Sequence, residues 1–259
     1  MNPNEILNLI KEAEKEGAQL MMHAHNVLSE CKSGHRDVVT EYDKKIQALL
    51  MERLGRALPG AAFFCEENMQ RDELNAEHLF IIDPIDGTMN FVRGFNHSCI
   101  SVAYCRNGEL SAAAVYNPYV DEMFTAIKGG GAYLNGRAIH VSDSPLSDSV
   151  VVCGTTPYDP QLSKEGFALM KKAFDASLDI RRQGSAELDL CSAASGRAGL
   201  YFELLISLWD YAAGMLIVQE AGGLVLNLQG EPIRFDGEKT SVLAGGKQAI
   251  EDFLKIKNS

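Results

Sequence analysis

Residues 79–88 read Leu79-Phe80-Ile81-Ile82-Asp83-Pro84-Ile85-Asp86-Gly87-Thr88, an apolar run that ends in two carboxylates. A short apolar run of this kind is typical of a buried strand, and α/β folds commonly bind ligands beyond such strand ends. Pro84 cannot continue strand pairing, and Gly87 lets the backbone approach a ligand closely. A helix that begins near Thr88 would point free N–H groups at the same place and favour an anion. We expect Asp83 and Asp86 to hold divalent cations that hold a phosphate, the alternative being an Asx turn with a helix N-cap.

Two further segments place carboxylates at the ends of predicted elements. Glu66 and Glu67 follow a predicted strand over residues 61–64, and Asp210 opens an apolar helix. Taken alone, the glutamate pair is typical of an exposed acidic surface, and Asp210 of a helix N-cap. Together with residues 79–88, however, they offer the oxygen ligands that Mg²⁺ prefers, with open positions for water. The three segments therefore predict a magnesium site.

The composition is that of a folded globular protein with an acidic balance. The 259 residues are 46% hydrophobic and 23% charged, unlike a disordered chain. Lys and Arg number 24 against 35 Asp and Glu, a formal net charge of −11. This balance argues against broad binding of a nucleic-acid backbone, which needs clustered cations. It does not exclude phosphate that is bound through metal ions.

Membrane and secretory signals are not expected. No stretch approaches the roughly 20 apolar residues that span a bilayer, and residues 1–17 are of mixed charge without the apolar core of a signal peptide. The six cysteines form no C-x-x-C pair, which favours buried, reduced thiols. We therefore expect a cytoplasmic protein without a membrane partner.

Hydrophobic periodicity predicts one globular unit with two lobes, an N-terminal α+β lobe over residues 1–145 and a C-terminal α/β lobe over 146–259. The first lobe is expected to contain helices over 4–30 and 41–58, strands over 61–64 and 79–82, and a β-meander over 98–106, 110–116 and 122–127. The second is expected to contain strands over 149–153, 179–182, 200–204, 223–226 and 241–244, and helices over 162–176, 187–195, 210–221 and 247–256. Asn107-Gly108 and Asn135-Gly136 predict tight hairpin turns, whereas the glycine run 129–131 lacks the G-K-[ST] of a phosphate loop and is interpreted as a turn.

The acid-bearing segments resemble the signatures of the inositol monophosphatase family, part of a Mg²⁺-dependent, lithium-sensitive phosphatase superfamily that includes fructose-1,6-bisphosphatase. The resemblance rests on Glu66-Glu67, on residues 83–91 (Asp-Pro-Ile-Asp-Gly-Thr-Met-Asn-Phe) and on Trp209-Asp210-x-Ala212-x-Gly214. It covers nearly the whole chain, from Lys32 to beyond Gly222-Gly223. It implies the layered αβαβα sandwich of inositol monophosphatase and fructose-1,6-bisphosphatase, and a homodimer.

The resemblance also implies a role for each matching residue. Two to three Mg²⁺ would be bound by Glu66, Asp83, the Ile85 carbonyl, Asp86 and Asp210. Backbone N–H groups of Gly87 and Thr88 would hold the phosphate. Thr88 and Asp43 would orient the attacking water, with Glu67 and the Glu66-bound third ion assisting. Substrate contacts would come from Asp86, Gly184, Ala186, Glu203 and Asp210, and residues 32–36 would form a mobile loop over the metals.

The activity implied by this resemblance is hydrolysis of a small phosphorylated polyol or sugar, with inositol 1-phosphate as the first expectation. A related phosphatase for fructose 1,6-bisphosphate, histidinol phosphate or a nucleotide 3′-phosphate is the alternative. Ser207 is smaller than the residue that several relatives carry there, which leaves the exact polyol open. A non-catalytic, partner-binding protein on the same fold is an alternative of a different class.

Overall fold

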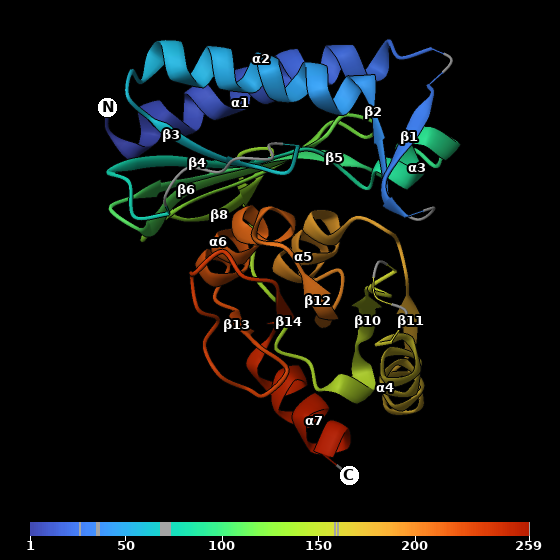
Figure 1. Ribbon diagram of the computed structural model, residues 1–259. Helices are drawn as coiled ribbons and strands as arrows, with labels where there is room; N and C mark the ends of the chain where they lie inside the picture. The colour runs from blue at the N-terminus through green and yellow to red at the C-terminus, as the bar shows by residue number, and fades with distance from the viewer. Residues whose placement is uncertain (26, 35–36, 68–73, 158, 160, 259) are drawn as a thin grey trace.

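The computed structural model describes residues 1–25, 27–34, 37–67, 74–157, 159 and 161–258. These residues form five alternating layers of helices and sheets, so the predicted layered αβαβα sandwich is confirmed (Figure 1). The helices that form the outer and middle layers are α1 (Pro3–Met22), α2 (Glu41–Ala57), α4 (Ser163–Ala176), α5 (Ala186–Ala194), α6 (Ala212–Glu220) and α7 (Lys247–Asn258). Helices α1 and α2 cover the first sheet, α5 and α6 lie between the two large sheets, and α4 and α7 cover the far face of the second (Figure 1).

The first large sheet has seven strands in the order of the chain from β3 to β9. They are β3 (Ala62–Cys65), β4 (His78–Asp86), β5 (Cys99–Arg106), β6 (Glu109–Asn117), β7 (Glu122–Ile127), β8 (Gly131–Leu134) and β9 (Arg137–Ala138). Strands β3 and β4 are parallel, whereas the others pair antiparallel. Because carboxyl ends of parallel strands meet at one edge, the residues after β3 and the end of β4 lie together. The predicted meander is confirmed, while β8 and β9 were not predicted.

The hairpin turns have the backbone that their sequences predict. Asn107 and Gly108 have φ of 53° and 78°, and Asn135 and Gly136 have φ of 49° and 78°. Positive φ at both central residues is the hallmark of the type I′ turn, whose twist matches the flanking strands. The glycine run after β7 is also a turn, as predicted. The N–H groups of Gly129 and Gly131 donate to the two carboxylate oxygens of Glu220 on α6, at 2.8 and 2.9 Å.

The second large sheet has the strand order β11-β10-β12-β14-β13. Its strands are β10 (Val150–Cys153), β11 (Asp179–Arg181), β12 (Leu200–Ile206), β13 (Leu224–Leu226) and β14 (Thr240–Gly245). Two short 3₁₀ turns, η1 (Leu146–Asp148) and η2 (Leu208–Asp210), precede β10 and α6. The predicted elements of this half are present within a few residues of their expected bounds. Apolar side chains of both sheets pack against α5 and α6, which makes these two helices the shared core.

The first helix is shorter than the apolar periodicity predicts, and the expectation of a helix to residue 30 is wrong. Helix α1 begins with a capping box between Asn2 and Glu5 and ends at Met22, with His23 as its C-cap. The chain then forms β1 (Ser29–Gly34), which pairs antiparallel with β2 (Asp37–Thr40). Local periodicity could not reveal this pairing, since the hydrogen bonds of β1 come from a partner strand later in the chain.

Among the helices of the described residues, none is both long enough and apolar enough to cross a membrane.

Glu14 on α1 is a fully buried acid. It has no exposed surface, and within the described residues neither carboxylate oxygen makes a hydrogen bond of normal geometry. Burial raises the pKa of the Glu14 carboxyl well above its usual value, and the charge of Glu187 raises it further, while the Val102 backbone lowers it slightly. An acid in such a place is neutral in the folded protein, because ionisation without a partner is costly.

Replacing Glu14 with Met should therefore stabilise the protein, and more so at high pH. A folded-state pKa above the unfolded value stabilises the fold at low pH, and that contribution is lost as the pH rises from about 4.5 through the raised pKa. We expect Glu14→Met to raise the free energy of unfolding by about 1–3 kcal/mol at pH 8, and by less at pH 5. Urea unfolding at both pH values measures this, with Glu12→Met at an exposed position of α1 as the control. A gain that is the same at both pH values would contradict it.

Candidate active site

Three carboxylates from two distant segments meet at the end of β4. Asp83 and Asp86 are the acids of β4, and Asp210 ends η2; one oxygen of each lies within 4.8 Å of the others. In a regular strand, residues three apart face opposite sides of the sheet. The pairing of β4 with β5 is irregular between Asp83 and Asp86, where Pro84 also removes an N–H donor. This irregularity allows both side chains to turn toward Asp210.

The three acids repel one another in a buried environment. Burial raises the pKa of Asp83 and of Asp210 well above the usual aspartate value, and the charges of Glu66 and Asp86 raise both further. Burial raises the pKa of Asp86 to about 6, although hydrogen bonds from Ser185, Glu187 and Ala186 oppose this shift. The hydrogen-bond donors around these carboxylates therefore do not fully compensate their negative charge.

The start of α5 supplies the hydrogen bonds to Asp86. Its carboxylate accepts from Ser185 Oγ at 2.5 Å, from the Glu187 N–H at 2.8 Å and from the Ala186 N–H at 3.2 Å. The predicted site residue Ala186 is therefore at the site, but its N–H group faces Asp86. Gly184 lies just before this helix with φ of +89°. Its carbonyl oxygen is 3.0 Å from where a Cβ on Gly87 would lie, so the two segments pass closely.

Glu66 and Glu67 lie at the adjoining end of β3, next to a lysine from β1. Lys32 Nζ is 2.9 Å from Glu66 Oε1 and also contacts Glu67 Oε1. Burial and the charge of Glu66 raise the pKa of Glu67 to about 7, although Lys32 lowers it. The neighbouring Glu66 carboxyl also raises the pKa of Asp83, beyond the larger effect of burial. Of the predicted loop 32–36, Lys32 belongs to β1 and residues 35–36 lie outside the described residues.

A chain of hydrogen bonds joins the predicted water-orienting residues to the acid cluster. Thr88 Oγ1 lies 3.1 Å from Asp43 Oδ1 and 3.0 Å from the Ile85 carbonyl oxygen, and can donate to either. The Ile85 N–H donates to Asp83 Oδ1 at 3.0 Å. Asp43 is fully buried, and its other oxygen accepts from the Thr40 N–H at 2.8 Å in the capping box of α2. Thr88 begins the short helix α3 (Thr88–Arg93), as its sequence predicts.

Glu203 approaches the cluster from β12. Its carboxylate accepts from the Thr156 N–H and from the Tyr201 hydroxyl, each at 2.9 Å. A Cβ on Gly154 would lie 2.0 Å from the Glu203 carboxyl carbon, so this close approach requires glycine. Burial raises the pKa of the Glu203 carboxyl, and the charge of Asp86 raises it further, while the hydrogen bonds from Thr156 and Tyr201 lower it. Four lone pairs on a carboxylate leave room for a further donor beyond these two.

Several residues that shape the site were not identified from sequence. Ser185 could have been found, because a serine before a predicted helix is a typical N-cap, and its Oγ also accepts from the Leu188 N–H at 3.4 Å. Thr156 and Tyr201 reach the site only through tertiary contacts and carry no local signal, and the contact of Lys32 with Glu66 and Glu67 was not predicted although Lys32 begins the predicted loop. Asp210 is not the N-cap of α6, since that position is Tyr211; its carboxylate instead accepts from the Ser207 N–H at 3.0 Å.

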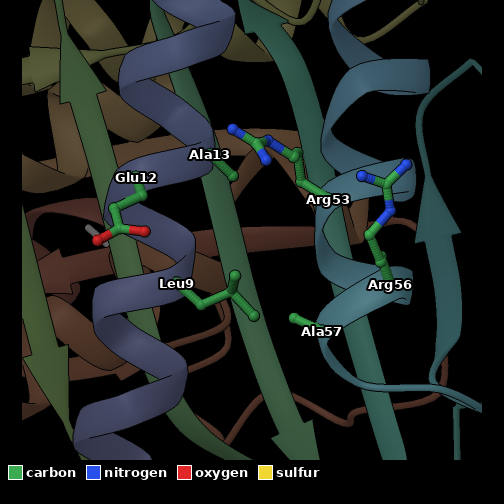
Figure 2. Close-up of a pocket in the computed structure, with 6 residues that line it drawn as sticks. All are labelled: Leu9, Glu12, Ala13, Arg53, Arg56 and Ala57. Atoms are coloured by element: carbon green, nitrogen blue, oxygen red, sulfur yellow. The ribbon is translucent and has the colours of Figure 1, made fainter.

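A separate groove lies on the outer helical layer. It has a volume of about 220 Å³ between α1 and α2 and is lined by Leu9, Glu12, Ala13, Arg53, Arg56 and Ala57 (Figure 2). Arg53 contacts Glu16, and Arg56 contacts Glu52 at 2.6 Å. Both cations are therefore already compensated, and none of the predicted site residues lines this groove.

Comparison with known proteins connects this geometry to a family. A model of the inositol monophosphatase family matches residues 3–257. The chain is 37% identical to Nus factor SuhB of Haemophilus influenzae over 229 residues, which cover 87% of this chain and 85% of that protein. It is 34% identical to inositol-1-monophosphatase of Mesorhizobium japonicum over 251 residues, which cover 95% and 93%.

Solved structures share the whole architecture. Extragenic suppressor protein suhB of Bartonella henselae superposes with a TM-score of 0.89 at 31% identity, covering 99% of this chain and 98% of that one. An IMPase/NADP phosphatase solved with Mg²⁺ and phosphate superposes with a TM-score of 0.84 at 28% identity, covering 98% and 93%. The matched residues include every carboxylate of the cluster, from Glu66 to Asp210. The chain belongs to the inositol monophosphatase family.

Proposed function

We propose that this protein is a Mg²⁺-dependent phosphatase that hydrolyses a small phosphorylated polyol or sugar, with inositol 1-phosphate as the first candidate. The convergence of Asp83, Asp86 and Asp210 is the observation that carries this proposal. Relatives named inositol-1-monophosphatase, and a solved family member with bound inositol monophosphate, support the substrate class. The two lobes are proposed to act as one catalytic unit, because α5 of the C-terminal lobe holds Asp86 of the N-terminal lobe.

The donor set fits divalent cations. Mg²⁺ prefers carboxylate and carbonyl oxygens. Burial and the neighbouring carboxylates raise the pKa of Asp83 and Asp210, which supports a site that gains from added positive charge. Glu66, Asp83 and the Ile85 carbonyl are proposed to hold one ion, and Asp83, Asp86 and Asp210 a second, with Glu66 able to hold a third. When bound, such ions activate water and stabilise the negative charge that develops on a phosphate group and its leaving oxygen.

The remaining chemistry is assigned to groups of the chain itself. Thr88 and Asp43 are proposed to orient the water. The Thr88 hydroxyl donates to Asp43 Oδ1, and its oxygen can at the same time accept a hydrogen bond from a water near the cluster. Glu67, beside Glu66, assists this arrangement. The N–H groups of Gly87 and Thr88 at the start of α3 are proposed to hold phosphate oxygens. Positioning and charge compensation dominate phosphoryl transfer, so no covalent intermediate with the protein is needed.

Substrate hydroxyl groups are proposed to bind on the side of the C-terminal lobe. Glu203 can accept a further hydrogen bond, and Asp86, Asp210 and the backbone at Gly184 and Ala186 adjoin the same space. The preference among inositol 1-phosphate, fructose 1,6-bisphosphate, histidinol phosphate and nucleotide 3′-phosphates depends on how their hydroxyl groups fit these acceptors.

Oligomer and compartment are parts of the same proposal. Phe167 and Phe174 on α4 and the nearby Leu178 are 63%, 50% and 64% exposed, which supports a buried contact in a homodimer. Each of the six cysteines is a free thiol, which supports a cytoplasmic location.

A second candidate is a partner-binding role on the same fold. Relatives from Haemophilus influenzae and Vibrio cholerae carry the name Nus factor SuhB rather than that of a phosphatase. A chain that binds Mg²⁺ but releases no phosphate from any substrate would favour this candidate.

Mg²⁺ should stabilise the wild-type protein against unfolding. Asp83→Asn should stabilise the metal-free protein and remove most of the stabilisation by Mg²⁺. Asp83 ionises at a higher pH in the folded than in the unfolded chain, so its charge destabilises the metal-free fold at pH 8. We expect Asp83→Asn to raise the unfolding temperature in EDTA, since the asparagine oxygen can still accept from the Ile85 N–H. Wild type should gain about 2.7 kcal/mol at a Mg²⁺ concentration of about 100 Kd, and the variant should lose most of this gain. The exposed Asp148→Asn is the control, and equal Mg²⁺ gains in all three proteins would contradict the metal site.

Phosphate release should depend on the same residue. We expect Asp83→Asn, while folded, to lower kcat/KM by at least about a thousandfold, because charge compensation of the transition state is lost. A panel of inositol 1-phosphate, fructose 1,6-bisphosphate, histidinol phosphate and a nucleotide 3′-phosphate, compared by kcat/KM, identifies the substrate. Retention of most activity in the variant would refute the assignment of Asp83.

Lithium should inhibit turnover by competing with Mg²⁺. A family member has been solved as a LiCl-soaked inhibitory complex, and this chain brings the carboxylates of Asp83, Asp86 and Asp210 together. We expect inhibition at tens of millimolar LiCl that weakens as Mg²⁺ is raised, with NaCl at equal ionic strength as the control for screening. Full activity in LiCl would place this chain outside the lithium-sensitive enzymes.

A further inference from the structure

The free N–H groups at the N-terminus of α6 are capped by a side chain from another helix. Helix α6 starts two residues after Asp210, and its first N–H groups have no partners within the helix. Its N-cap residue, Tyr211, makes no side-chain cap hydrogen bond in the described structure. Instead, the Ala213 N–H donates to Glu187 Oε1 at 3.2 Å and the Gly214 N–H to Glu187 Oε2 at 2.6 Å. Glu187 belongs to α5, so the cap is supplied across the helix pair.

The same residue contacts the metal-binding cluster through its backbone. The Glu187 N–H donates to Asp86 Oδ2 at 2.8 Å. Its side chain therefore holds the segment that follows Asp210, while its backbone holds Asp86. One residue thus connects the two segments whose carboxylates meet in the cluster.

The packing around Glu187 is shaped for this contact. Glu187 has no exposed surface. Burial and the charge of Asp86 raise the pKa of its carboxyl group well above the usual value, while the hydrogen bonds from the Gly214 and Ala213 N–H groups lower it. A Cβ on Gly214 would lie 2.6 Å from Glu187 Oε2 and 2.6 Å from Leu190 Cβ. Only glycine at this position lets α6 approach α5 closely enough for both hydrogen bonds.

We propose that Glu187 is a positioning residue for the metal centre: by joining the N-termini of α5 and α6, it fixes Asp86 and Asp210 at the separation that divalent cations require. This inference rests on the proposed function, because it concerns the Mg²⁺ site of that function. Glu187 itself does not contact the ions; it acts through Asp86 and through the start of α6. Residues that orient metal ligands in this way commonly change metal affinity when they are replaced.

The chain contains a matched control for this role. Glu220, at the opposite end of α6, also accepts two backbone N–H groups with one carboxylate, those of Gly129 and Gly131. Its partners are Gly129 in the turn after β7 and Gly131 at the start of β8, and neither element holds a proposed metal-binding acid. Loss of Glu220 therefore removes an equivalent pair of hydrogen bonds from the same helix without disturbing Asp86 or Asp210.

The experiment measures Mg²⁺ binding to the full-length protein by titration calorimetry, together with the unfolding temperature in EDTA. We expect Glu187→Ala to weaken Mg²⁺ binding by about tenfold or more. Glu220→Ala should lower the unfolding temperature but leave Mg²⁺ affinity within about twofold of wild type, the range expected for a residue that does not orient a ligand. Glu187→Gln keeps the size of the side chain, but its amide can accept only one of the two N–H groups and should weaken binding to an intermediate degree.

Two outcomes overturn the proposal. If both Glu187 variants bind Mg²⁺ as tightly as wild type, Glu187 is a purely structural residue like Glu220. Glu187→Gln decides the matter if Glu187→Ala does not fold. Binding is measured without substrate, so absent turnover in wild type would count against the proposed phosphatase function alone. Absent Mg²⁺ binding in wild type would refute both the proposed function and the role of Glu187.

Discussion

Electrostatic repulsion among buried carboxylates is the constraint on which the rest of this structure depends. Asp83, Asp86 and Asp210 lie within 4.8 Å of one another by one oxygen each, and burial raises the pKa of all three. Ionised groups this close cost several kcal/mol in a medium of low dielectric constant unless opposite charge or hydrogen bonds compensate them. Backbone N–H groups and hydroxyl groups donate hydrogen bonds to these carboxylates, and this offsets only part of the repulsion.

The layered architecture explains how those donors reach the cluster. Parallel pairing of β3 and β4 brings Glu66 beside Asp83, while the start of α5 points its N–H groups at Asp86. Because α5 and α6 pack between the two large sheets, the N–H groups that hold Asp86 belong to a helix of the core rather than to a surface loop. A site built in this way keeps its ligands in place before any ion binds, which favours precise metal geometry.

The sequence predicted the parts of this site that depend on local pattern. The apolar run before Asp83 predicted a buried strand that ends in acidic residues. Asn107-Gly108 predicted a tight hairpin turn. Both features depend on the local sequence. The helix expected to continue to residue 30 stops at Met22, since pairing of β1 with β2 is a tertiary contact. Glu187, and the ion pairs that Lys32 makes with Glu66 and Glu67, were missed for the same reason. Their partners lie far along the chain, and no local spacing identifies them.

The excess of acidic residues has a different effect at this site than on the surface. Most of the excess carboxylates are solvated on the surface, but those near β4 are buried, where water does not screen them. A phosphate monoester is itself an anion, so ionised carboxylates without bound cations would repel the proposed substrate. Under the proposed function, bound divalent cations would reverse the sign of the local charge, so the ions would have to enter before the phosphate. The proposed dependence on metal would therefore follow from the electrostatics of the protein as well as from the chemistry of hydrolysis.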